Sequence, residues 1–390
     1  MTVNYIFDVL LKLFLADIII FGSLGLKVGD VSIRKVLTSI LIGLFVFISV
    51  KNKLIKTWHV HLVVVLSLVF GIWAVGVPLA NSVIMEHAIS ESLPLTGLLL
   101  ILPISEAMKR NGSVRYLDFA NFCLSVVSFV IISVWICATF LGKPEYAFKV
   151  KEFFSIISGE DFAIYIGPMA DGSFRVMWIV CLLLPFIMMY KNRRGFDFGW
   201  SAFYLLAIYA SGTRSLIYSS FLMVLILILR YRPLISGILI PSIFIGIVFY
   251  SQQLEFLRVF ELRSEFNSDS VRVEQTLSLL RLFSENVFFG AGFGAQSDIV
   301  RSFDRPYSYE MTYVSLLAKV GLLGCFVFAW FFCSTLKDAL RLFNGNKSEV
   351  VILFASFLFI TGTNPYLLNF VGVTLIAMIV SLTITASCKY

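Results

Sequence analysis

The sequence predicts an all-α fold: a polytopic integral membrane bundle of about twelve transmembrane helices, forming a single membrane domain over residues 1–390. Hydrophobic residues make up 59% of the chain and charged residues only 14%, and the mean hydropathy is +0.91. A soluble protein of this length could not bury so much apolar surface. Apolar runs of about 18 residues or more also recur along the chain, and each can cross a hydrocarbon core about 30 Å thick.

The apolar runs define the expected spans in order. They lie at 5–26, 36–50, 62–82, 93–107, 116–140, 176–190, 198–212, 215–230, 234–250, 309–333, 350–364 and 367–386. The segment Met1–Ile6 contains no basic residue, and no small-residue cleavage site follows the first run. We therefore interpret that run as a retained span and not as a signal peptide.

Basic residues in the connectors predict how the spans are oriented. Lysine and arginine cluster in the even-numbered connectors, for example at Lys191, Arg193 and Arg194 after the sixth span. The positive-inside rule therefore places these connectors and both termini on the cytoplasmic side of an inner membrane. The short first connector, which contains Lys27, Arg34 and Lys35, departs from this rule.

Several function classes find no support in the sequence. The net charge of +7 does not indicate a nucleic-acid partner, because the lysines cluster at the ends of apolar runs. Most cysteines lie inside apolar runs without the spacing of a metal site or a disulfide framework. The chain has no Ser-His-Asp set and no nucleotide-phosphate loop, so we expect no metal and no cofactor. The energy for any group transfer must then reside in the substrate.

Two long connectors, about 141–175 and 251–308, lie on the extracytoplasmic side in this topology. The second is expected to form a helical cap, and its cations are all arginine: Arg258, Arg263, Arg272, Arg281, Arg301 and Arg305. Arginine binds phosphate oxygens through two parallel hydrogen bonds and stays charged, so the set favours an anionic ligand such as a lipid diphosphate. The alternative is that each arginine balances a neighbouring glutamate on a solvated helix.

A short polar turn, Ser211-Gly212-Thr213-Arg214-Ser215, separates two apolar runs. It places Arg214 at the outer membrane boundary, where a full charge is costly and usually functional. The hydroxyls of Ser211 and Thr213 can donate to phosphate. The alternative is an arginine that extends its charged end to the interface.

Two further features follow in the long connector. The segment Phe289–Gly294 has glycine at every second position, which predicts a tight turn returning the loop toward the membrane. Glu310 opens the tenth span among tyrosines that include Tyr309. A carboxylate at that depth can serve as a general base, and the tyrosines can stack on sugar rings. The alternatives are a structural ion pair with a loop arginine and an interfacial aromatic belt.

The second half of the chain, from Ser211 to Gly324, resembles the bacterial O-antigen polymerase and O-antigen ligase superfamily. The resemblance consists of three features in order: the Ser211–Ser215 turn with its arginine, Arg272 ahead of Gly290-Ala291-Gly292, and a polar residue, Glu310, ahead of Gly321-Leu322-Leu323-Gly324. Gly172-Ser173-Phe174-Arg175, before the sixth span, is similar to another arginine site of that family.

This resemblance implies a glycosyltransferase that uses undecaprenyl-diphosphate-linked oligosaccharide in the bacterial inner membrane, together with a chain-length regulator as a partner. It implies catalytic roles for Arg214, Arg272 and Glu310. The diphosphate or the glycan would also contact Arg281, Arg305, Arg175, Ser211, Thr213 and Tyr309.

The chain departs from the ligase pattern at one position, where the ligases carry histidine followed by asparagine and this chain has Glu310 and Met311. The departure favours a polymerase, which joins the growing glycan to an incoming lipid-linked repeat. A ligase that transfers the glycan to the lipid A core is the first alternative. A flippase or transporter is the second, and it would place charges in the middle of its spans.

Overall fold

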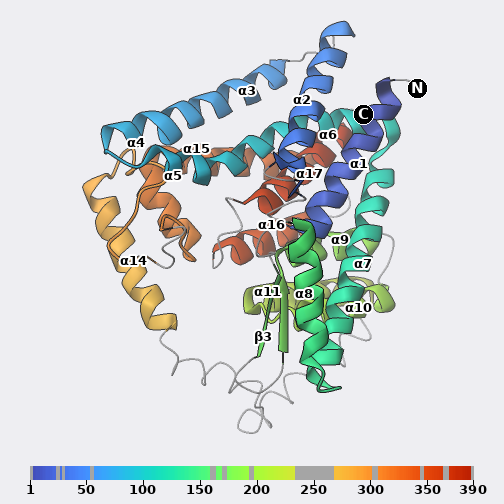
Figure 1. The fold of residues 1–390 in the computed structure, drawn as a ribbon. Helices are drawn as coiled ribbons and strands as arrows, with labels where there is room; N and C mark the ends of the chain where they lie inside the picture. The colour runs from blue at the N-terminus through green and yellow to red at the C-terminus, as the bar shows by residue number, and fades with distance from the viewer. Residues whose placement is uncertain are drawn as a thin grey trace.

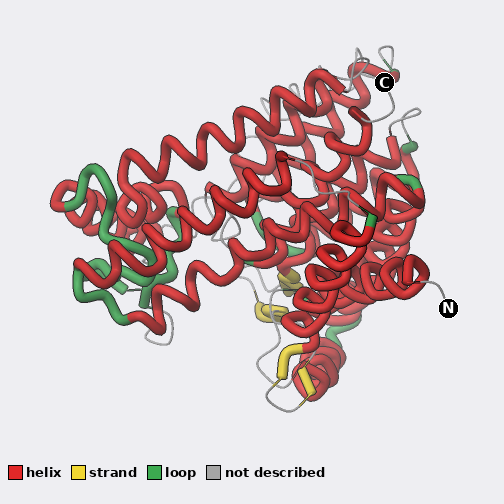
Figure 2. Tube along the Cα trace, turned by 90° about the horizontal axis from the view of Figure 1, so that it is seen from above, coloured by secondary structure: helices red, strands yellow, loops and turns green. Residues whose placement is uncertain are grey.

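The computed structural model describes residues 3–22, 27–28, 31–52, 57–158, 164–168, 174–192, 197–232, 268–300, 306–342, 347–362 and 369–387. Helices make up most of this part of the chain (Figure 1). Within these described residues, strands occur only as two short antiparallel pairs, which appear as brief segments among the helices in Figure 2. The expectation of a mainly helical protein is therefore confirmed.

The first half of the chain alternates long helices with tighter turns of helix. Its elements are α1 (Val3–Phe21), β1 (Lys27–Val28), β2 (Val31–Ser32), α2 (Ile33–Lys51), α3 (Thr57–Val69), the π-helical η1 (Phe70–Gly76), α4 (Val77–Ala80), α5 (Met85–Ser92), the 3₁₀ segment η2 (Leu93–Leu100), α6 (Ile101–Asn111), α7 (Ser113–Thr139) and α8 (Pro144–Ser158). Because η2 joins α5 to α6 without a break, helix runs continuously from Met85 to Asn111.

The second half begins with a β-hairpin, and its other described elements are helical. Its elements are β3 (Ile164–Pro168), β4 (Phe174–Trp178), the 3₁₀ segment η3 (Ile179–Leu183), α9 (Leu184–Lys191), α10 (Phe198–Ala210), α11 (Arg214–Tyr231), α14 (Ser268–Glu285), α15 (Thr312–Leu342), α16 (Lys347–Gly362) and α17 (Phe370–Ser387). In the hairpin, Arg175 of β4 lies opposite Gly167 of β3.

Within the described residues, five helical segments are long and apolar enough to cross a membrane. They are Ile33–Lys51, His59–Ala80, Met85–Asn111, Ser113–Thr139 and Thr312–Ser334. Shorter apolar helices occur at Phe198–Ala210, Ser215–Leu229 and Phe370–Leu382. These segments indicate a membrane protein, and each overlaps a span expected from the sequence. The total of about twelve spans stays a prediction.

The structure differs from the expected span at 176–190. The run 176–190 begins in strand β4 and becomes α-helical only over Leu184–Lys191, so it is not one continuous helix. Residues 174–178, which include Val176 and Trp178, pair with β3, and hydropathy alone does not distinguish such a strand from a helix. The connector 141–175 is correspondingly structured, with α8 and the hairpin. The expected span 234–250 lies outside the described residues.

The first helix pair accounts for one of the three basic residues that depart from the orientation rule. Arg34, at the start of α2, is 2% exposed, and its Nε donates to Asp17 Oδ2 of α1 at 2.7 Å. The guanidinium is therefore bound to a carboxylate of the neighbouring helix, and it does not act as a free topological charge.

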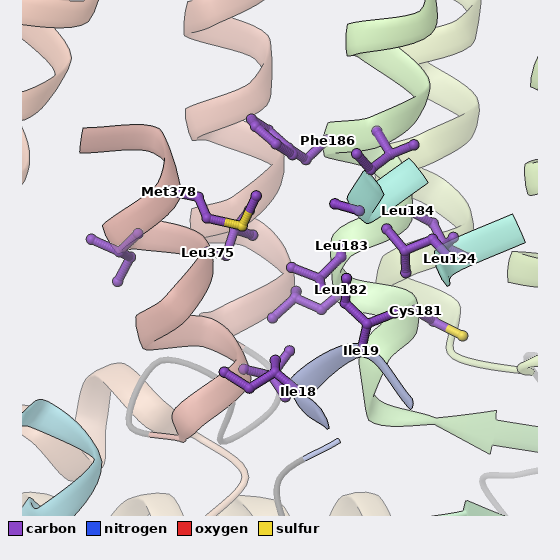
Figure 3. Close-up of a cluster of buried hydrophobic side chains, with 14 of the residues drawn as sticks. Ile18, Ile19, Leu124, Cys181, Leu182, Leu183, Leu184, Phe186, Leu375 and Met378 are labelled. Atoms are coloured by element: carbon purple, nitrogen blue, oxygen red, sulfur yellow. The ribbon is translucent and has the colours of Figure 1, made fainter. Parts of the chain in front are cut away.

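The core lies where α1, α7, η3, α9 and α17 meet. Figure 3 shows Leu182 and Leu183 of η3 beside Leu375 and Met378 of α17, with Ile18 of α1 close by. All of these side chains are buried. In a bilayer such contacts stabilise the bundle through close packing, because the surrounding lipid is as apolar as the side chains themselves.

Candidate functional site

Helix α15 is broken near the middle of its apolar segment. Gly321 has φ 63° and ψ −169°, which no helical residue adopts, and it divides the candidate span Thr312–Ser334 into two half-helices. At 1.5 Å per residue the break lies about 14 Å along the helix from Thr312. A break inside a membrane span leaves backbone groups without helical partners, and each must find another partner.

The glycine turn, Phe289–Gly294, and the two residues before it supply those partners. A regular helix would bond the N–H groups of Leu322 and Leu323 to the carbonyls of Ala318 and Lys319. Instead, these two N–H groups donate to Val287 O at 2.9 Å and Phe288 O at 3.1 Å, respectively. The two carbonyls left over accept from the turn, Ala318 O from Ala291 N at 2.9 Å and Lys319 O from Gly292 N at 2.8 Å. The segment 287–292 thus fills the break in α15 through four backbone hydrogen bonds.

Glycine is required in this turn for both conformation and space. Gly290, Gly292 and Gly294 have φ of 70°, 92° and 79°, a region that side chains disfavour. A Cβ at Gly290 would overlap the backbone of Lys319, and a Cβ at Gly292 would overlap Pro78 of α4. The sequence-based expectation of a tight turn is confirmed, and the turn packs against both α15 and the α4–α5 region.

A buried ion pair joins the same elements. Lys319 of α15 is 0% exposed, and its Nζ donates to Glu91 Oε1 of α5 and to Tyr307 O. The second carboxylate oxygen of Glu91 accepts from Gly294 N at 2.7 Å. Burying two charges is costly unless both are paired and hydrogen-bonded, and these contacts satisfy that condition.

Arg272 and Glu310, both expected to be catalytic, form an ion pair. Arg272 lies in the first half of α14, and its Nε donates to Glu310 Oε2, just before α15 begins. The Arg272 side chain is 42% exposed and that of Glu310 is 15% exposed. The pair therefore reaches the surface on the arginine side, where an anion can approach.

Tyr309 is buried beside this pair and does not face the surface. It is 2% exposed, and its hydroxyl accepts from Ser297 N at 2.7 Å. Burial raises the pKa of the hydroxyl above its ordinary value. The ring packs with Leu279 of α14 and Ala318 of α15. The geometry gives Tyr309 a packing role, and its expected contact with substrate stays a prediction.

The other expected phosphate contacts are dispersed. Arg281 is 73% exposed on α14, and its Nη1 lies 3.7 Å from Asp298 Oδ2. Arg175 is partly buried on β4, in the hairpin that Figure 1 shows well away from α14. Arg305 lies outside the described residues. The structure therefore brings together Arg272 and Glu310, and their roles stay predictions.

The Ser211–Ser215 segment is a turn, as expected. Gly212 has φ 63°, and α11 begins at Arg214. Ser211 is 0% exposed, and its hydroxyl donates to Ile208 O at 2.6 Å, while Thr213 is partly exposed. The hydroxyl hydrogen of Ser211 is thus already bound inside the protein. In Figure 1, α11 lies near the centre and α14 at the edge of the molecule.

The sequence analysis does not identify three polar residues that lie near this site. Lys319 and Glu91 were not selected, although a lysine within an apolar run is a recognised signal of function. The third residue is His87 of α5, whose ring lies 5.2 Å from that of Tyr307 and whose Nδ1 lies 3.0 Å from Gln296 Nε2. Among the described residues, no group of three or more His, Cys, Asp or Glu side chains is arranged to hold a metal ion.

No model of a known protein family and no curated protein matches this sequence.

Proposed function

We propose that the chain is a membrane glycosyltransferase that polymerises lipid-linked oligosaccharide repeats at the outer face of the bacterial inner membrane. The donor is the growing glycan on undecaprenyl diphosphate, and the acceptor is a terminal hydroxyl of an incoming lipid-linked repeat. The observation that carries this proposal is the contact between Arg272 and Glu310 at the point where the arginine-only loop meets the α15 span.

The two side chains suit the two charge changes of such a transfer. The acceptor hydroxyl oxygen bonds to the anomeric carbon, and its proton passes to the Glu310 carboxylate. The bond from that carbon to the diphosphate oxygen breaks, and the electron pair leaves with the lipid diphosphate. Arg272 stabilises the charge that develops on this leaving group, and Arg214 is proposed to assist.

The ion pair suggests how the site is prepared. The Arg272 guanidinium binds Glu310, so neither side chain is left as an isolated charge in a partly apolar site. A diphosphate binds a guanidinium through two parallel hydrogen bonds. When it takes Arg272, the Glu310 carboxylate becomes available to accept a proton.

Purified protein and lipid-linked repeats test this assignment. We expect Glu310→Gln to lower turnover about a hundredfold or more while substrate binding persists, because the amide keeps the shape but cannot act as a base. Arg272→Lys should lower turnover by about thirty- to a thousand-fold, because charge alone does not replace the two-point contact. Glu274→Gln, on an exposed face of the same helix, is the matched control and should retain full activity.

A charge exchange separates catalysis from structural pairing. The double variant Arg272→Glu with Glu310→Arg keeps an ion pair but exchanges the positions of the carboxylate and the guanidinium. If it polymerises at the wild-type rate, the pair is structural and the proposed roles are wrong. We expect a stable but inactive protein.

Lipopolysaccharide from a deletion strain tests the function in the cell. A polymerase mutant retains a single repeat on the core, a ligase mutant leaves finished glycan on the carrier lipid, and a flippase mutant retains repeats inside the cell. We expect the single-repeat phenotype. Either of the other phenotypes would contradict the proposal and support the ligase or the flippase instead.

A further inference from the structure

The ion pair between Glu91 and Lys319 lies beside the Arg272–Glu310 site without belonging to it. Lys319 is in the last turn of the first half-helix of α15, where a cation interacts favourably with the helix dipole. It is also fully buried inside a candidate membrane span, which is a costly place for a charge without a purpose.

The pair contacts both ends of the segment that leads from the glycine turn to Glu310. Glu91 holds the near end through Gly294 N, and Lys319 holds the far end through Tyr307 O. Lys319 Nζ also lies 5.2 Å from the ring centroid of Tyr309, the residue before Glu310. The backbone that presents Glu310 is therefore attached to α5 and α15 by these two charged side chains.

The partner of Glu310 is located by the same part of α15. Leu279 of α14 is 0% exposed and packs with Tyr309 and with Ala318, the residue before Lys319. Because Arg272 lies about two turns before Leu279 on α14, this contact sets the position of the Arg272 backbone as well. Both members of the Arg272–Glu310 pair are thus positioned relative to the break in α15.

We propose that Glu91 and Lys319 are a positioning pair that holds the glycine turn in the break of α15 and thereby keeps Glu310 opposite Arg272. Neither residue touches the reacting atoms. The inference rests on the proposed function only in assigning chemistry to Glu310 and Arg272, and its geometric part can be tested without any activity.

The test uses the double variant Glu91→Gln with Lys319→Met. A single Lys319→Met leaves a buried carboxylate without its ammonium partner and endangers folding, whereas removing both charges together is usually tolerated. The new glutamine still offers an oxygen to Gly294 N, but the new methionine has no donor for Tyr307 O. Glu91→Gln alone, which keeps the lysine contact to Tyr307 O, is measured beside it. Lys337→Met, an exposed lysine on the same helix, is the matched control.

Thiol crosslinking reports the geometry. Cysteines replace Arg272 and Glu310 in a background without the six native cysteines, and a short bis-methanethiosulfonate reagent links them. We expect efficient crosslinking in this background and with Lys337→Met. We expect an intermediate yield with Glu91→Gln and a yield several-fold lower with the double variant. A yield with the double variant equal to that of the background overturns the inference.

Kinetics with Arg272 and Glu310 intact provide the second readout. We expect the double variant to lose about tenfold in kcat or more, with KM within about twofold, because misplacement affects the reacting geometry more than binding. Loss of crosslinking with an unchanged kcat supports the positioning role and counts against the proposed function. Full activity of Glu310→Gln likewise counts against the function alone, and the crosslinking yield still decides the inference.

Discussion

Replacing Gly321 with alanine tests whether the break in α15 is a built feature of the fold. Gly321 has φ 63° and ψ −169°, a region that essentially only glycine adopts, and an alanine there costs roughly 1–3 kcal/mol. The added Cβ would also overlap Phe288 O and Gly290 N, so the turn must move away from α15. That movement breaks the four backbone hydrogen bonds across the break, worth about 0.5–1.5 kcal/mol each. The expected loss of stability is therefore about 3–9 kcal/mol.

Gly43→Ala provides a control that is not expected to lower the stability. Gly43 lies inside helix α2, and a Cβ there would meet no atom within 4 Å. Because alanine favours a helix over glycine by about 0.5–1 kcal/mol, this variant should be as stable as the wild type or slightly more stable.

Both variants are measured as purified protein in the same detergent. Fluorescence-detected size exclusion after heating gives the apparent melting temperature, which we expect to fall by roughly 5 °C or more for Gly321→Ala and not for Gly43→Ala. Equal melting of Gly321→Ala and the wild type would show that α15 accommodates a continuous helix, and the account of the break would be refuted.

Three further predictions follow from the structure and the expected topology. Arg34→Met should destabilise the α1–α2 pair by about 3–5 kcal/mol, because Asp17 is then buried without its guanidinium, and adding Asp17→Asn should restore most of the loss on heating in detergent. Arg214→Lys should abolish polymer ladders in a complemented deletion strain at matched expression, and normal ladders would remove Arg214 from the site. A cysteine at Asp298 should react with a membrane-impermeant thiol reagent in intact cells, and one at Lys191 should not; the reverse pattern would invert the topology.

Local patterns in the sequence predicted the helical class and the turns. Apolar runs such as 116–140 are long, so their helices follow from length and composition, and α7 covers nearly all of that run. Glycine at every second position predicted the turn at 289–294, because few other residues adopt positive φ. The Ser211–Ser215 turn follows in the same way.

Long-range partners could not be predicted from these patterns. Glu91 and Lys319 are separated by 228 residues, and neither spacing nor composition shows that they meet. The break at Gly321 was equally hidden, because a single glycine is tolerated in many membrane helices. The pairing of Arg272 with Glu310 was among the alternatives raised by the sequence, but only the packing of α14 on α15 makes it specific.

The buried charges bear on the choice between an enzyme and a transporter. Charges inside membrane spans usually mark a pathway, and a transporter changes their surroundings as it alternates between states. Lys319 is instead bound by Glu91 and by Tyr307 O, beside a turn attached to its own helix by four backbone hydrogen bonds. Exposing this lysine to a passing substrate would require breaking all of these contacts together inside the bilayer. Such an arrangement indicates a rigid scaffold around Lys319, which is the reason for proposing an enzyme and not a transporter.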